Sequence, residues 1–132
     1  MEIIDKIAYL HLVDGKVLST LSKGKDKYYL PGGKREGSET DVQTLVREIK
    51  EELSVSIVPA TARLYGVFEA QAHGKAEGVL VKMTCYTADY TGQLAADSEI
   101  AEIVWLTYAD IDKVSSVDKL IFEDLRAKGL LA

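Results

Sequence analysis

The chain has 132 residues, 47% of them hydrophobic, and carries a formal net charge of −5. This composition predicts one domain over residues 1–132 with a substantial core, and it excludes a disordered chain. The acidic balance, without a long basic run, excludes a protein that binds nucleic-acid polymers through their backbone.

The first quarter of the chain predicts strands. Residues 3–13 are rich in β-forming side chains and end at the hairpin dipeptide Asp14-Gly15. Residues 16–21 are therefore expected to return as a second strand. A short third strand is predicted over residues 28–30, which stop at Pro31.

The spacing of the apolar residues changes after this loop and becomes helical. The apolar positions are Val42, Leu45, Val46, Ile49 and Leu53. They predict a helix over about residues 39–53 with one buried face. Ser38 is predicted as the N-cap, because serine oxygens accept hydrogen bonds from the first backbone N–H groups of a helix.

The second half of the chain predicts mainly strands and a closing helix. Strands are expected over residues 63–71, 79–88 and 99–106. The first two are joined by a turn-rich segment, 73–78. Thr107 is expected to cap a short turn over 108–113, and Ser116 a final helix that ends near Gly129. This order predicts the α/β (α+β) class, with a mixed sheet between helices.

The same sequence predicts where the protein is found in the cell and what role its single cysteine has. No apolar stretch approaches the length of a membrane span, and the N-terminus lacks a signal-peptide core. We therefore expect a cytoplasmic protein without a membrane partner. Cys85 is the only cysteine, which excludes an internal disulfide, and its apolar surroundings predict a buried structural thiol.

The most informative segment is an acidic helix face with a glycine loop before it. Glu48, Glu51 and Glu52 stand at i, i+3 and i+4, so they share one face and repel each other. A divalent metal such as Mg²⁺ is the simplest partner for them, because hard ions take carboxylate oxygens. Gly32 and Gly33 allow the backbone to approach a ligand closely. The alternatives are a solvated acidic face and an ordinary loop.

The spacing of this segment also matches a family pattern, the Nudix box. The matching positions are Gly33, Glu39, Arg47, Glu48, Ile49, Glu51, Glu52 and Val55. Ser54 is the one departure, because the pattern has glycine there. Residues 33–55 therefore resemble the box of the Nudix hydrolases, the MutT-like pyrophosphohydrolases. The resemblance implies the Nudix fold, an α/β/α sandwich with a mixed β-sheet between helices.

The resemblance also implies roles for the residues of the box. Glu48, Glu51 and Glu52, with the backbone carbonyl of Gly32, would hold Mg²⁺ or Mn²⁺. Either Glu48 or Glu51 would instead hold or deprotonate the attacking water, and the sequence does not decide between them. Arg47 would orient the catalytic glutamates rather than touch substrate.

Three further positions follow from the resemblance. Glu39 would support the junction between loop and helix. Relatives often supply one more catalytic glutamate from a distant segment, and Glu99 and Glu102 are the candidates, with Glu102 preferred; the alternative for each is a solvent-facing strand residue. Ser54 has no ligand role in the pattern, and a serine in left-handed conformation costs about 1 kcal/mol.

Candidate substrate contacts lie beside the glycine loop. Lys23 before it and Lys34 after it are candidates for binding substrate phosphates, and Tyr28 for stacking on a base. The alternatives are a solvated surface for the lysines and core packing for the tyrosine.

The predicted activity is metal-dependent hydrolysis of a pyrophosphate bond in a nucleoside diphosphate linked to another moiety. A nucleoside or deoxynucleoside triphosphate, (d)NTP, or a related nucleotide, is the favoured small-molecule substrate. The alternatives are a catalytically silent Nudix module that binds a nucleotide or protein, and a structural domain with an accidental acidic helix. A homodimer and a monomer both remain open.

Overall fold

The computed structural model describes residues 2–72, 75 and 77–132, so part of the predicted turn over residues 73–78 lies outside the described residues. The elements in chain order are β1 (Ile3–Tyr9), β2 (Leu12–Val13), β3 (Lys16–Ser22), β4 (Gly32–Gly33), α1 (Asp41–Leu53), β5 (Ser56–Ile57), η1 (Pro59–Thr61), β6 (Arg63–Gln71), β7 (Leu80–Thr87), β8 (Tyr90–Thr91), β9 (Ile100–Leu106), η2 (Tyr108–Lys113) and α2 (Ser116–Ala127). No helix within the described part of the chain is long and apolar enough to cross a membrane.

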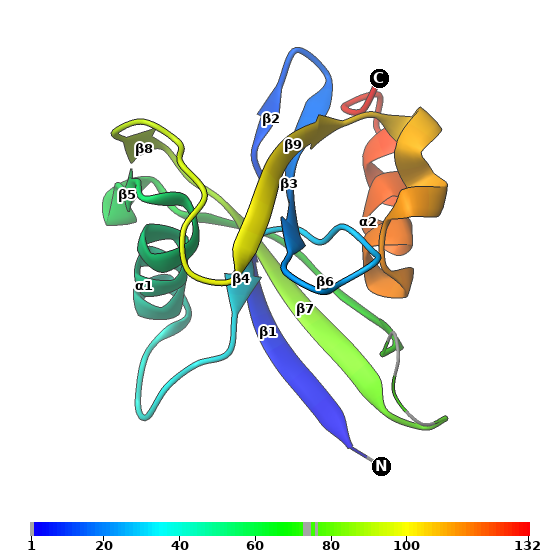
Figure 1. The fold of residues 1–132 in the computed structure, drawn as a ribbon, viewed down its shortest axis with the longest axis horizontal. Coiled ribbons are helices and arrows are strands. Elements are labelled where there is room, and N and C mark those ends of the chain that lie inside the picture. The colour runs from blue at the N-terminus through cyan, green and yellow to red at the C-terminus, as the bar shows by residue number, and fades with distance from the viewer. Residues whose placement is uncertain (1, 73–74, 76) are drawn as a thin grey trace.

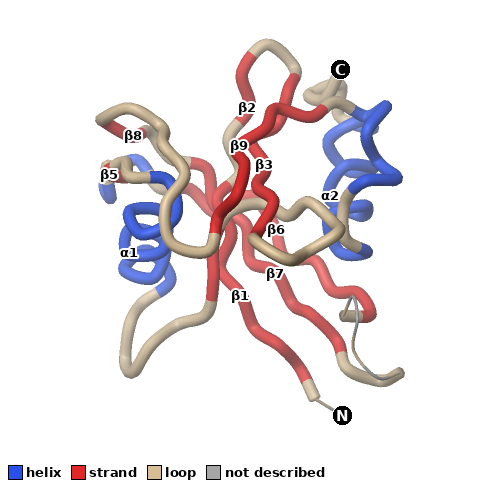
Figure 2. Tube along the Cα trace, in the orientation of Figure 1, coloured by secondary structure: helices blue, strands red, loops and turns tan. Residues whose placement is uncertain are grey.

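A mixed four-stranded sheet forms the middle of the molecule (Figure 2). Its strand order is β4-β1-β7-β6, with β1 parallel to β7 and the other two pairs antiparallel. The pairing sets Gly33 opposite Ile7 and Gly32 opposite Ala8. The glycine loop is thereby fixed as an edge strand of the sheet. A second sheet, β2-β3-β9, and the small β5-β8 pair complete the strands.

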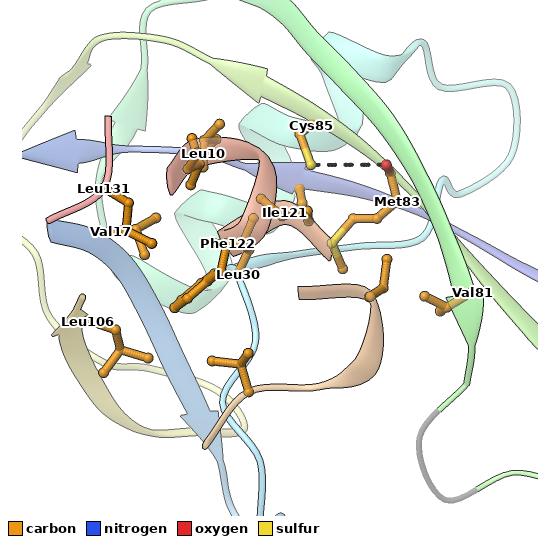
Figure 3. Packing of buried hydrophobic residues seen from close by; sticks show 14 of the residues in the cluster. Leu10, Val17, Leu30, Val81, Met83, Cys85, Leu106, Ile121, Phe122 and Leu131 are labelled. Carbon is orange, nitrogen blue, oxygen red and sulfur yellow. Dashed lines mark hydrogen bonds between the residues drawn. The ribbon is translucent and has the colours of Figure 1, made fainter. Parts of the chain in front are cut away.

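The two α-helices lie on opposite sides of the central sheet (Figure 1). Helix α1 packs on β1, β4 and β5, whereas α2 packs on β6, β7 and η2. Each side has its own core. The α1 side is centred on residues such as Leu45 and Ile49, and the α2 side on Ile121 and Phe122 (Figure 3). This arrangement confirms the predicted α/β/α sandwich with a mixed sheet.

Helix α1 forms where the apolar spacing predicts it, but it begins at Asp41. Its N-cap is Thr40, so the prediction of Ser38 is wrong. Thr40 accepts a hydrogen bond from the Gln43 backbone N–H at 3.2 Å, and the Gln43 side chain accepts one from the Thr40 N–H at 2.9 Å. Ser38 has Asp41 three residues on rather than the glutamate or glutamine of a capping box, which explains the shift.

Three other boundaries differ from the prediction. Helix α2 is capped by Ser115 and not Ser116, because the Ser115 hydroxyl accepts the Asp118 N–H at 3.4 Å. The predicted strand over residues 3–13 is divided into β1 and β2. The predicted strand over residues 28–30 is reduced to two isolated bridges.

Candidate active site

The glycine loop enters the site as strand β4. At Gly32 the φ angle is +148°, and a Cβ atom there would overlap the carbonyl oxygen of Ile7. At Gly33 a Cβ atom would overlap the carboxyl group of Glu48. Glycine at the first position lets the loop pair closely with β1, and glycine at the second leaves room for a glutamate of α1.

Arg47 joins this loop to helix α1. Its Nε and Nη2 donate to the two carboxylate oxygens of Glu39 at 2.7 and 2.9 Å. Its Nη1 donates to Glu48 at 2.8 Å and to Glu51 at 3.4 Å, and Nη2 also donates to the Lys34 carbonyl at 2.9 Å. The forked guanidinium therefore sets the direction of two helix glutamates, which the predicted orienting role requires.

Glu39 is held as an anion at the base of this network. Its Oε1 also accepts hydrogen bonds from the Glu36 N–H at 2.9 Å and the Thr44 hydroxyl at 3.1 Å. The hydrogen bonds from Arg47, above all, lower the pKa of Glu39 to about 2. A carboxylate that stays charged in this way anchors Arg47 and does not exchange protons near neutral pH.

Glu52 is a deeply buried carboxylate at the end of α1, with 5% of the residue exposed. Its Oε1 accepts a hydrogen bond from the Gly32 N–H at 3.0 Å. Burial, together with the nearby charges of Glu48 and Glu99, raises the pKa of Glu52 to about 8 against the effect of that hydrogen bond. Burial also raises the pKa of Glu48, which Arg47 opposes. The site therefore concentrates negative charge in a poorly hydrated place.

The segment before β9 brings Glu99 to the helix carboxylates. The negative charge of Glu99 helps to raise the pKa of both Glu48 and Glu52, and Glu99 lines the same cavity as Glu52. Glu102 is exposed on β9, opposite Leu21, and is not part of that lining among the described residues. The position of Glu99 therefore favours it over Glu102 as the further glutamate, and the preference for Glu102 stays an untested prediction. The turn that precedes β9 forms hydrogen bonds with the end of α1 through Ala95 and Asp97. Glu99 follows this turn directly and is therefore placed near Glu52.

A cavity of about 210 Å³ lies beside Glu52, between the sheet and the start of α2. Apolar residues of β1 and β7 line it together with polar side chains. The polar lining includes Lys6, Thr20, Lys25, Tyr29, Glu99 and Ser115. Pockets for drug-sized ligands begin at roughly 300 Å³. The space accordingly suits part of a small molecule.

Two charged residues of this region escaped the sequence analysis. Lys6 on β1 places its ammonium 5.4 Å from the centre of the Tyr29 ring, and burial lowers its pKa against the charge of Asp118. Asp118 is fully buried, and its Oδ2 accepts the Leu30 N–H at 2.7 Å. Its Oδ1 has no partner within the described residues. Burial raises the pKa of Asp118 to about 7.

The predicted substrate contacts differ in their surroundings. Lys23 and Lys34 are exposed, and their backbones touch the site: the Lys23 N–H donates to the Glu99 carbonyl at 2.7 Å, and the Lys34 carbonyl accepts from Arg47. Tyr28 is partly buried and packs against the core of the α2 side, which favours the alternative of core packing over stacking on a base. Its neighbour Tyr29 lines the cavity instead.

The oxygen donors of this region suit a hard divalent cation, because such ions prefer carboxylate oxygens. In the conformation described, no three His, Cys, Asp or Glu side chains of residues 2–72, 75 and 77–132 converge closely enough to hold a metal. Arg47 draws Glu48 and Glu51 toward itself, while Gly32 fixes Glu52. The Glu51 side chain is 50% exposed, and its bond to Arg47 is long at 3.4 Å.

Comparisons with known proteins agree with this geometry. Residues 7–125 match the model of the NUDIX domain. The E. coli ORF135 protein is 26% identical, with a TM-score of 0.69, and the match covers 97% of this chain and 94% of that one. A MutT NUDIX hydrolase from Burkholderia pseudomallei is 21% identical, with a TM-score of 0.72 and coverages of 93% and 98%. A MutT protein from Methanosarcina mazei Go1 is 17% identical, with a TM-score of 0.77 and coverages of 97% and 96%.

No curated protein matches the sequence significantly. The family model nevertheless spans most of the chain, including the glycine loop, the acidic helix and the start of α2. The solved structures share its fold over nearly their whole length. The chain therefore belongs to the NUDIX domain family.

Proposed function

We propose that the protein hydrolyses the pyrophosphate bond of a nucleoside diphosphate linked to another moiety, with Mg²⁺ or Mn²⁺ as its cofactor. A nucleoside or deoxynucleoside triphosphate is the favoured substrate. The observation that carries the proposal is the buried Glu52, which is bonded to the glycine loop, flanked by Glu48 and Glu99, and set at a cavity. Carboxylates with raised pKa values in a cavity are typical of functional sites.

Each residue of the proposed site has a role that follows from its position. Glu48, Glu51 and Glu52, with the Gly32 carbonyl, would hold the metal. When bound, the metal supplies positive charge for the diphosphate and lowers the pKa of a water. Glu48 or Glu51 accepts the proton of the attacking water. Arg47 keeps both in place, because it bonds to each of them.

The substrate is oriented by what lies on either side of these glutamates. The cavity beside Glu52 receives the part of the substrate away from the scissile bond, with Lys6 and Tyr29 in its wall. Lys23 and Lys34 are exposed, and their ammonium groups would bind phosphate oxygens of the substrate. The limited size of the cavity supports a small molecule rather than a polymer as the partner.

The test measures phosphate and pyrophosphate release with Mg²⁺ or Mn²⁺ across nucleoside triphosphates, dinucleotides and nucleotide sugars. Glu52→Gln is assayed in parallel, with Glu69→Gln as its control, since Glu69 is an exposed glutamate of β6. We expect turnover of one substrate class that requires the metal, is lost in Glu52→Gln and is kept in Glu69→Gln.

Two other outcomes contradict the proposal in different ways. Nucleotide binding without turnover in any arm of the panel indicates a silent binding module. Turnover that survives both Glu52→Gln and removal of metal by a chelator places the chemistry outside the residues named here.

A further inference from the structure

Ser54, the one residue that departs from the family pattern, makes a contact that glycine cannot make. It ends helix α1 in left-handed conformation, with φ 66° and ψ 17°. Its N–H donates to the Lys50 carbonyl at 3.1 Å, as the end of a helix requires. Its hydroxyl donates to the carbonyl of Ala95 at 3.1 Å, across 41 positions of sequence. The side chain therefore joins the helix end to the segment before β9.

The same segment, residues 95–98, covers the end of α1 with three more hydrogen bonds. The Ala95 N–H donates to the Leu53 carbonyl and the Asp97 N–H to the Glu52 carbonyl, both at 3.0 Å. The Ser98 hydroxyl donates to the Glu51 carbonyl at 3.2 Å. The last carbonyls of a helix have no partner within it. Here the 95–98 segment supplies those partners, so its position depends on α1.

Glu99 follows directly after this segment. Ser98 before it is also left-handed, with φ 52°, and its N–H donates to the Asp97 carboxylate at 2.7 Å. The Glu99 carbonyl accepts the Lys23 N–H at 2.7 Å, which fixes the other side of the residue. Glu99 lines the same cavity as Glu52, and its carboxyl contributes to the raised pKa of Glu52. Its location is thus set by contacts on both sides.

We propose that Ser54 is a positioning residue, whose hydroxyl holds the 95–98 segment on α1 and thereby keeps Glu99 beside Glu52 for metal binding. Ser54 itself touches neither metal nor substrate. Glycine would relax the left-handed backbone at this position but would lack the hydrogen bond to Ala95. The proposal rests on the proposed function, because it treats Glu52 and Glu99 as parts of a metal site.

The test is a series of substitutions at Ser54 that separates backbone relief from the hydrogen bond. Ser54→Gly removes both the strain and the hydroxyl, and Ser54→Ala removes only the hydroxyl. Ser54→Asn tolerates left-handed backbone and restores a donor. Asp14→Gly is the matched control, because Asp14 is also a left-handed non-glycine residue but lies in the β2–β3 turn.

The first readout is Mn²⁺ affinity without nucleotide, measured by electron paramagnetic resonance, with thermal unfolding recorded alongside. Loss of one hydrogen bond predicts that the Mn²⁺ Kd rises about fivefold in Ser54→Gly and Ser54→Ala. Ser54→Asn and Asp14→Gly are expected to keep the Kd of the natural protein. Ser54→Gly is expected to unfold near the natural midpoint, since strain relief offsets the lost bond.

The second readout is a double-mutant cycle with Glu99→Gln. If Ser54 acts through Glu99, then Ser54→Gly has no further effect on the Mn²⁺ Kd in the Glu99→Gln protein. An unchanged Kd in Ser54→Gly, or additive effects in the cycle, overturns the positioning role. A natural protein that neither binds Mn²⁺ nor hydrolyses nucleotides refutes the proposed function itself, which is a distinct result.

Discussion

The two sides of the sheet use buried charge in different ways. On the α1 side each carboxylate has a donor: Glu39 and Glu48 accept from Arg47, and Glu52 accepts from the Gly32 N–H. On the α2 side Asp118 is fully buried, yet one of its oxygens has no partner within the described residues. The three glutamates are thus held by donors from the protein, whereas Asp118 keeps unused hydrogen-bonding capacity; Asp5 of β1, which Arg35 joins to α1, shares that feature through its Oδ1.

The glutamates beside α1 are held by fixed hydrogen-bond donors, whereas one oxygen of Asp118 has no partner within the described residues. Donors that are fixed in advance cost no reorganisation during a reaction, which suits the side that carries the glutamates. Buried polar atoms without protein partners are usually completed by water or a ligand.

Glu52→Gln tests the α1 side most severely. We expect kcat to fall about 10³-fold, because a carboxylate that neutralises the metal is lost. The fold is expected to survive or gain stability, since the pKa of Glu52 is raised from 4.5 to about 8 and its ionised form is penalised in the folded state. That penalty grows as pH rises between these values. Kinetics and thermal unfolding at pH 9 check both effects, and retained activity contradicts the assignment.

Alanine substitutions at the two loop glycines are expected to differ in their effects on stability and activity. Gly32→Ala forces a Cβ atom into the Ile7 carbonyl at a positive φ, so we expect a stability loss of about 3 kcal/mol. Gly33→Ala meets the carboxyl of Glu48, which is the movable end of a side chain. Its stability cost is expected near 1 kcal/mol, with a larger loss of activity. Denaturant unfolding and kcat measured on both variants distinguish these outcomes. Equal stability losses would contradict the distinction.

Arg47→Lys tests whether the site needs the several directed N–H donors of the guanidinium or only its positive charge. Lysine keeps the charge but cannot bond two oxygens of Glu39 and also Glu48 in fixed directions. We expect kcat/KM to fall about 10- to 100-fold, because the glutamates lose their orientation. Arg35→Lys is the control, since Arg35 also donates through Nε and Nη2 to a carboxylate, there to a single oxygen of Asp41. A similar loss of activity in both variants would assign the effect to general stability.

The same contrast explains what the sequence predicts and what it hides. Helix α1 and its carboxylates follow from apolar spacing and from the fixed intervals of the box, since both are local properties. The place of Glu99 depends on a segment held by long-range hydrogen bonds and a left-handed Ser98. No local pattern encodes that path, and the sequence analysis therefore preferred Glu102 on the strand.

The sequence analysis did not find Lys6 and Asp118, and the reasons differ from those for Glu99. Lys6 lies two residues from Ile4 and Ala8, and all three line the cavity. Strand alternation alone does not say whether such a lysine faces water. Asp118 occupies the first turn of α2, where an acidic residue is ordinary because it favours the helix dipole. Only the folded structure shows it to be fully buried, with the Leu30 N–H as its hydrogen-bond donor.

Asp118→Asn tests the α2 side and is expected to have the smallest effect. The ordinary pKa of 3.8 is raised to about 7 by burial, so the folded state holds a proton that the unfolded chain releases. The stability of the natural protein therefore falls as pH rises from 3.8 to 7. Asparagine removes that slope and still accepts the Leu30 N–H, but its amide adds a buried donor. We expect a net gain of about 1 kcal/mol at pH 8, because these terms partly cancel. Unfolding by urea at pH 4 and pH 8 checks it. A pH slope between them that persists unchanged in the variant would show that Asp118 does not gain a proton on folding.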